Sequence, residues 1–138
     1  MILLDTSGLL AAIDASQNAH EEASAALAAA DGPMLLSPFV LAELDYLVAA
    51  RVGEGARLSL LEEVEHGAYA LQPMSGSDIT RARAVIKAHA ALGISLADAS
   101  IVVLAERHSL RDVLTLDQRH FRVLTVAGKP FRVLPADA

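Results

Sequence analysis

Two acidic residues follow the ends of short apolar runs. Asp5 comes directly after Ile2–Leu4, and Asp117 comes two residues after Val113–Thr115. If both runs are parallel strands, their carboxyl ends lie at the same edge of a sheet, which is where open α/β folds bind ligands. Each acid also has a simpler interpretation, as a helix cap or a turn residue.

Two further acids lie in the first turns of predicted helices. Glu43 lies about 100° from Leu44 around its helix, at the shoulder of an apolar stripe, and its simpler interpretation is a side chain lying flat along the surface. Asp98 follows Ser95 at the spacing of a capping box. The helix behind it is apolar almost all round, which indicates a buried helix whose start lies near the strand ends.

One sheet topology would bring all four acids to a single crevice. Carboxylates that converge without partners repel one another, so they become protonated or bind a cation. The chain has no cysteine, and its histidines show no paired ligand spacing. Because oxygen ligands suit Mg²⁺ or Mn²⁺, the sequence predicts a divalent-metal site. Taken alone, Asp5, Asp98 and Asp117 have a helix cap or a turn as the alternative, and Glu43 has a surface position.

Five short, mostly apolar runs are predicted strands, and helices are predicted between them. The runs are Ile2–Leu4, Met34–Leu36, Ala68–Leu71, Val113–Thr115 and Arg132–Leu134. Such runs are typical of strands covered on both faces, and their alternation with helices predicts a mostly parallel sheet between helix layers. The expected fold is a three-layer α/β/α domain with about five strands.

Polar residues mark where the predicted helices begin. Asn18 with Glu21 resembles a capping box, and Ser37 precedes a proline that suits the first helical position. Further helices are predicted to begin near Gly8 and near Ser77.

Length and composition fit one domain over residues 1–138. The apolar runs are far shorter than a membrane-spanning helix, and the absence of cysteine excludes disulfides. The first basic residue is Arg51, so the start of the chain lacks the positive region of a signal peptide. We therefore expect a cytoplasmic location and no membrane association.

The net charge of −6 is unevenly distributed along the chain. Residues 1–69 hold eleven acids and two basic residues, whereas residues 70–138 hold six acids and nine basic residues. Such a split is typical either of two faces with different partners or of charges that merely solvate helix surfaces.

Four segments resemble the PIN-domain ribonucleases, and within them the VapC-type toxins of type II toxin–antitoxin systems. They are LLDTSGL at 3–9, SPFVLAEL at 37–44, LADASIVVLAE at 96–106 and VLTLDQRHF at 113–121. The segments follow the family's order over essentially the whole chain, and the resemblance implies a PIN-like α/β/α fold.

The resemblance also implies a catalytic quartet, which falls on Asp5, Glu43, Asp98 and Asp117. Three of them, Asp5, Asp98 and Asp117, are the implied metal ligands, while Glu43 is a ligand or orients water. Thr6 matches a hydroxyl beside the first acid. Thr115 occupies a position where some relatives carry a further polar or acidic group.

The implied activity is metal-dependent endoribonuclease cleavage, in which Mg²⁺ or Mn²⁺ assists hydrolysis of an RNA phosphodiester bond. The implied partners are RNA, a cognate antitoxin that neutralises the toxin, and a second copy in a homodimer. Arg119 and Arg122 follow Asp117 closely and are candidate RNA-binding residues, with pairing to surface acids as the alternative.

Two other functions stay open on the residues alone. A receiver-type phosphoacceptor domain needs a lysine at a late strand end, a position that neither Lys87 nor Lys129 holds. A non-catalytic binding module, whose acids only cap helices, would show no stabilisation by Mg²⁺ or Mn²⁺.

Overall fold

A five-stranded sheet runs through the middle of the molecule in the computed structural model, which describes all of residues 1–138. Its strands are β1 (Ile2–Leu4), β2 (Met34–Leu36), β3 (Ala70–Leu71), β4 (Asp112–Leu114) and β7 (Arg132–Leu134). The order is β3-β2-β1-β4-β7, and every neighbouring pair is parallel. The predicted sheet is confirmed, although β3 is shorter than predicted and β4 begins and ends one residue earlier.

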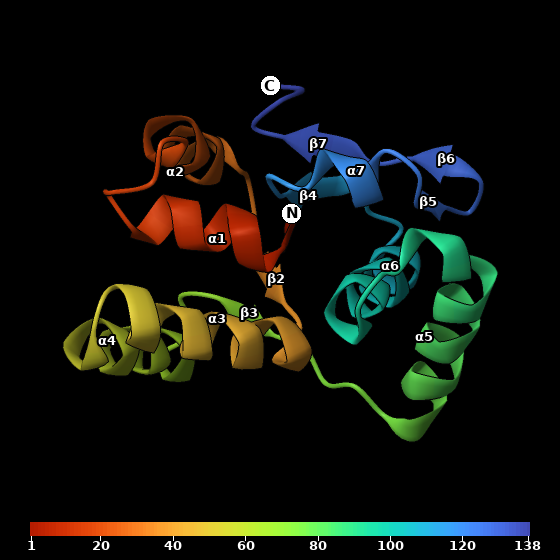
Figure 1. Cartoon of the computed structure of the whole chain (residues 1–138), viewed down its shortest axis with the longest axis horizontal. Helices are drawn as coiled ribbons and strands as arrows, with labels where there is room; N and C mark the ends of the chain where they lie inside the picture. Colours follow the sequence, from red (N-terminus) through yellow and green to blue (C-terminus); the bar gives the residue numbers. More distant parts are fainter.

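Seven α-helices connect these strands in two layers. They are α1 (Thr6–Ile13), α2 (His20–Ala29), α3 (Pro38–Arg51), α4 (Glu54–Glu65), α5 (Gly76–Ala88), α6 (Leu96–His108) and α7 (Gln118–Phe121), with a 3₁₀ turn η1 (Ala90–Leu92) after α5. Figure 1 shows α1 to α4 on one side of the strands and α5 and α6 on the other. A small antiparallel hairpin, β5 (Thr125–Val126) and β6 (Lys129–Pro130), precedes β7. The three-layer α/β/α arrangement is thus confirmed.

The sheet and α6 form the centre of the hydrophobic core. All three residues of β1 are at most 1% exposed, and α6 is buried at every position from Ala97 to Ala105. This confirms the buried helix that the apolar pattern predicts, and it fixes the start of α6 close to the strand ends. No α-helix combines the length and the apolar character that crossing a bilayer requires.

The strand order reverses direction at β1. The chain moves outward from β1 to β2 and β3, then returns to the other side of β1 for β4 and β7. The connections after β1 and after β4 therefore leave the same sheet edge on opposite faces, which opens a crevice at the carboxyl ends of these two neighbouring strands. Asp5 and Thr115 are the first residues beyond those two strands.

The start of α1 lies directly against the end of β4. A Cβ on Gly8 would sit 2.3 Å from the backbone oxygen of Leu114, a separation that no real side chain tolerates. Glycine at this position therefore lets the first turn of α1 approach the β4 backbone, which brings Asp5 and Ser7 next to Thr115.

The helix starts agree with the sequence in some places and differ in others. The Ser37 hydroxyl accepts a hydrogen bond from the Phe39 amide at 3.2 Å, which confirms the predicted cap of α3. The predicted capping box at Asn18 is wrong, because α2 begins at His20 and has no side-chain cap. The loop before α2 is organised instead by Asp14, which accepts hydrogen bonds from the amide and the hydroxyl of Ser16. Helix α1 begins at Thr6, two residues before its predicted start.

Candidate metal centre

A cleft of about 400 Å³ at the carboxyl ends of β1 and β4 is lined by all four acids of the predicted quartet. They reach it from four elements: the end of β1, the second turn of α3, the first turn of α6, and the turn between β4 and α7. Glu43 thus lies one turn later in its helix than predicted. The acids are Asp5, Glu43, Asp98 and Asp117. The fold therefore brings together carboxylates that are far apart in sequence, as the strand-end positions predict.

Asp5 is the most buried carboxylate in the cleft, with an exposed fraction of 5%. Its Oδ2 accepts hydrogen bonds from Thr115 Oγ1 at 2.6 Å and from Ser7 Oγ at 3.1 Å. Burial raises the pKa of Asp5 to about 6, the Thr115 hydrogen bond opposes this, and the nearby charge of Asp98 adds to the rise. Ionised Asp5 is thus held in a position where a bound cation would favour its charged form.

The same two hydroxyls tie Asp5 to the β4–α7 turn. The Leu116 amide donates to Ser7 Oγ at 2.9 Å, and the Asp117 amide donates to Thr115 Oγ1 at 2.9 Å. Each hydroxyl therefore accepts from the turn and donates to Asp5, which fixes the turn that carries Asp117. Thr115 supports the site in this way, and Ser7, which sequence reasoning passed over, does the same.

Glu43 is exposed and is oriented by Thr6, whose hydroxyl donates to Glu43 Oε1 at 2.7 Å. The helix that carries Glu43 is anchored at its start by a buried contact in which the Ser37 and Ser100 hydroxyls lie 2.7 Å apart. Since Ser100 belongs to α6, this contact fixes the first turn of α3 against the helix that carries Asp98.

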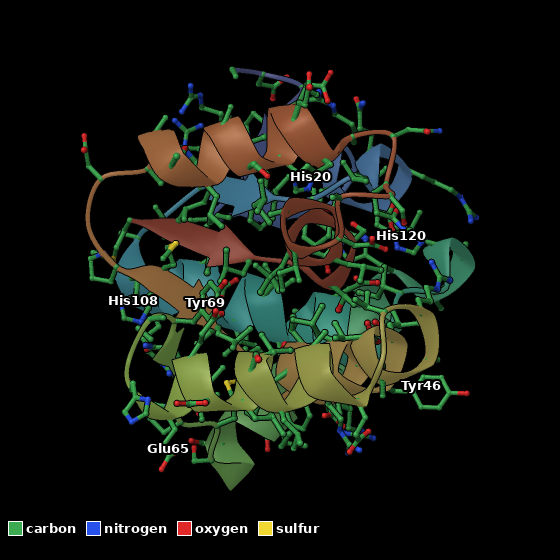
Figure 2. The ribbon with its side chains drawn as sticks, turned by 90° about the vertical axis from the view of Figure 1, so that its left-hand side faces the viewer. His20, Tyr46, Glu65, Tyr69, His108 and His120 are labelled. Atoms are coloured by element: carbon green, nitrogen blue, oxygen red, sulfur yellow. The ribbon has the colours of Figure 1, made fainter.

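Asp98 and Asp117 converge on the imidazole of His120. Nδ1 of His120 lies 3.1 Å from Asp98 Oδ2 and 2.9 Å from Asp117 Oδ2, and one ligand atom from each residue fits within 4.8 Å of the others. Figure 2 shows His120 near the edge of the molecule, among side-chain oxygen atoms. Spacing along the sequence does not reveal this group because its members belong to different elements; the only local signal is the three-residue step from Asp117 to His120, one helical turn.

The capping alternative holds for two of the acids and fails for one. Asp98 completes a capping box with Ser95, and Asp117 caps α7 by accepting from the His120 amide at 3.0 Å. Asp5 precedes α1, but its side chain makes no capping hydrogen bond to the helix. Capping therefore explains part of the placement of Asp98 and Asp117, but it does not explain why a carboxylate is buried at the end of β1.

The arginines near the cleft differ in whether an acid pairs with them. Arg122 pairs with Asp137 at 2.8 Å, whereas Arg119 is exposed and makes no ion pair. Arg51, from the last turn of α3, lines the cleft and is also outside every ion pair. Neither lysine of the chain lines the cleft, so a receiver-type site lacks its lysine here.

The donor set fits a divalent cation. The cleft offers carboxylate oxygens from four residues and hydroxyl groups that hold two of those carboxylates in place. The imidazole nitrogen of His120 lies beside two of the carboxylates. Ions of the Mg²⁺ and Mn²⁺ class favour this oxygen-rich chemistry.

The fold, the cleft and the order of its acids define a PIN-domain protein. Residues 2–125 match the PIN domain family, and the chain belongs to that family. It is 41% identical to Ribonuclease VapC26 of Mycobacterium tuberculosis over 135 residues, which cover 97% of this chain and all of that protein.

Two solved structures share the fold. VapC20 of Mycobacterium tuberculosis, described as a toxin that cleaves the sarcin–ricin loop, superposes with a TM-score of 0.83 over 94% of this chain and 100% of its own, at 19% identity. The FitAcB structure from Neisseria gonorrhoeae gives a TM-score of 0.60 at 28% identity, covering 88% of this chain and 91% of its own. The expected PIN-like α/β/α fold is confirmed.

Proposed function

We propose that this protein is a VapC-type toxin, an endoribonuclease that hydrolyses RNA phosphodiester bonds with the help of Mg²⁺ or Mn²⁺. The observation that carries the proposal is one cleft lined by Asp5, Glu43, Asp98 and Asp117 at the carboxyl ends of β1 and β4. The identity of 41% with Ribonuclease VapC26 over nearly the whole chain supports a ribonuclease rather than another nuclease.

Asp5, Asp98 and Asp117 would hold the ion, and Glu43 would orient the attacking water. A divalent ion in this position supplies charge neutralisation for the scissile phosphate and lowers the pKa of water. Hydroxyl groups hold two of the carboxylates in position: Thr115 and Ser7 donate to Asp5, and Thr6 donates to Glu43.

Hydrolysis in this cleft adds the water oxygen to phosphorus and breaks the bond between phosphorus and the 3′ oxygen. The departing 3′ oxygen takes a proton, and the products are a 5′-phosphate and a 3′-hydroxyl. Glu43 is exposed and held at one oxygen only by Thr6, so its second oxygen is free to accept a hydrogen bond from water.

RNA would approach along the exposed arginines of the cleft rim. Arg51 lines the cleft itself, and Arg119 is exposed two residues beyond Asp117. Both are outside ion pairs, so their charges are available to phosphate, while the Asp137 carboxylate already neutralises Arg122. The binding role therefore fits Arg51 and Arg119 better than Arg122.

A ribonuclease of this kind needs a restraint in its own cell, and we infer a cognate antitoxin and action in the cytoplasm. The acidic first half of the chain is suited to a partly basic, amphipathic antitoxin segment. We also infer a homodimer, which completes the proposed assembly.

The direct test compares cleavage of RNA by the wild type and by variants that keep size but lose charge. We expect Asp5→Asn, Asp98→Asn and Asp117→Asn to abolish cleavage and to relieve toxicity on expression, with Glu43→Gln equal or milder. Sequencing of RNA 5′ ends should show new 5′-phosphate ends with the wild type only.

A matched control is Asp45→Asn. Asp45 lies on the same helix as Glu43, but it pairs with Arg57 at 2.6 Å and is outside the cleft. This variant should cut RNA as the wild type does. Cleavage at the wild-type rate by Asp5→Asn would refute the proposal.

A further inference from the structure

The imidazole of His120 lies beside two of the proposed metal ligands, at the distance expected of a further ligand. Its Nδ1 lies 3.1 Å from Asp98 Oδ2 and 2.9 Å from Asp117 Oδ2. Adjacent ligand atoms around an octahedral ion, each about 2.1 Å from it, lie about 3.0 Å apart. The nitrogen thus lies as far from each of the two oxygens as neighbouring ligands of one ion do, and one ligand atom from each of the three residues lies within 4.8 Å of the others.

We propose that His120 Nδ1 is a ligand of the divalent ion, and that this nitrogen makes the site prefer a first-row transition ion such as Mn²⁺ over Mg²⁺. The inference rests on the proposed function for the presence of an ion in the cleft. It adds to that function the class of ion that the site selects.

The position of His120 is fixed by its neighbours in α7. The His120 amide donates to Asp117 Oδ1 at 3.0 Å, which sets the turn between the two residues. The next residue, Phe121, is fully buried and packs edge-on against Phe131, with ring centroids 5.4 Å apart. Because α7 is anchored on both sides, the His120 side chain, which is 16% exposed, stays beside the carboxylates.

The proton distribution of the imidazole allows both the observed contacts and metal binding. Without an ion, an Nδ1–H group can donate to the Asp98 and Asp117 carboxylates. With an ion bound, Nδ1 would be the ligand atom and Nε2 would carry the ring proton. Imidazole nitrogen suits transition ions, whereas Mg²⁺ favours oxygen ligands and keeps several waters. A nitrogen ligand therefore favours Mn²⁺ over Mg²⁺.

Electron spin-echo spectroscopy of the wild-type protein loaded with Mn²⁺ tests the nitrogen directly. We expect a nitrogen coupling that changes when histidine is labelled with ¹⁵N, and that disappears in His120→Gln. The matched control is His108→Gln. Its ring lies at the opposite side of the molecule in Figure 2, with Nε2 3.0 Å from Gln72 Oε1, and its replacement should leave the coupling in place.

Titrations of Mn²⁺ and of Mg²⁺, followed by calorimetry, give the second measurement. We expect His120→Gln to weaken Mn²⁺ binding about tenfold or more and Mg²⁺ binding less than threefold, so that the preference for Mn²⁺ is lost. Absence of a nitrogen coupling in the wild type, or an equal loss of affinity for both ions, would overturn the proposal and leave His120 as a hydrogen-bond donor that positions the carboxylates.

RNA cleavage is measured separately, so failure of the two proposals can be told apart. If the wild type shows the nitrogen coupling but cuts no RNA, His120 is a metal ligand and the proposed ribonuclease activity is refuted. A wild type that cuts RNA without the coupling overturns the ligand role of His120 alone.

Discussion

Replacing Asp5 by asparagine should stabilise the metal-free protein at neutral and alkaline pH. The pKa of Asp5 is raised from 3.8 to about 6, chiefly by burial. The folded protein therefore binds this proton more tightly than the unfolded chain does. Stability from this group is present at low pH and is lost as the pH rises through about 6.

The size of this effect follows from the shift of about two pKa units. At 1.36 kcal/mol for each unit, ionised Asp5 lowers the free energy of unfolding by about 3 kcal/mol at pH 8. Asparagine is neutral at every pH and keeps an oxygen that can accept from Thr115 and Ser7. For a domain of this length we expect Asp5→Asn to melt on the order of 5–10 °C above the wild type in EDTA at pH 8.

The pH and the metal provide two internal checks on this variant. At about pH 4.5 most Asp5 is protonated in the folded wild type, so the difference in the free energy of unfolding should fall to about 1 kcal/mol. Added Mg²⁺ or Mn²⁺ at pH 8 should raise the melting temperature of the wild type and leave that of Asp5→Asn nearly unchanged, because only the wild type retains the full ligand set.

Asp14→Asn is the matched control, since it should respond with the opposite sign. Hydrogen bonds from the Ser16 hydroxyl and amide lower the pKa of Asp14, so its charge contributes stability at pH 8 that is lost in acid. The assay for both variants is thermal unfolding followed by circular dichroism, in EDTA and in metal. Two results would refute the view that the buried charge of Asp5 destabilises the metal-free fold. One is a melting temperature of Asp5→Asn below that of the wild type in EDTA at pH 8, and the other is a difference in melting temperature that does not change with pH.

Two further outcomes are expected from changes around the cleft. Gly8→Ala places a Cβ 2.3 Å from the Leu114 oxygen and should lower the free energy of unfolding by about 2 kcal/mol or more. The control Gly55→Ala, in an open position of α4, should leave the free energy of unfolding unchanged or raise it by up to about 1 kcal/mol. Equal urea midpoints for the two variants would contradict the close approach of α1 to β4. Arg51→Ala should weaken RNA binding and reduce the slope of log affinity against log salt by about one. Arg122→Ala removes an arginine already paired with Asp137 and should leave that slope unchanged. A slope reduced by Arg122→Ala and unchanged by Arg51→Ala would place the RNA on the α7 side.

The pattern of apolar runs and caps was sufficient to predict the sheet and most of the site. Short strands covered on both faces are mostly apolar, so the sequence predicts the exact bounds of β1, β2 and β7, although β7 begins with the exposed Arg132. The strand-end positions of Asp5 and Asp117 predicted a shared crevice, because parallel strands end at one edge. The capping signal at Asn18 failed because a capping box is a weak local preference, and the contacts of Asp14 decided where α2 begins.

Only the tertiary structure decided which side chains meet across the cleft. His120 and Asp98 are 22 positions apart, and Ser7 and the Leu116 amide are 109 apart, so no local period connects them. The pKa of Asp5 depends likewise on burial beneath several elements and on the charge of Asp98. The sequence by itself determines the residue types and where the strands end. The ligand set, the desolvation of Asp5 and ion pairs such as that of Arg122 depend on distances that are set only when the helices pack on the sheet.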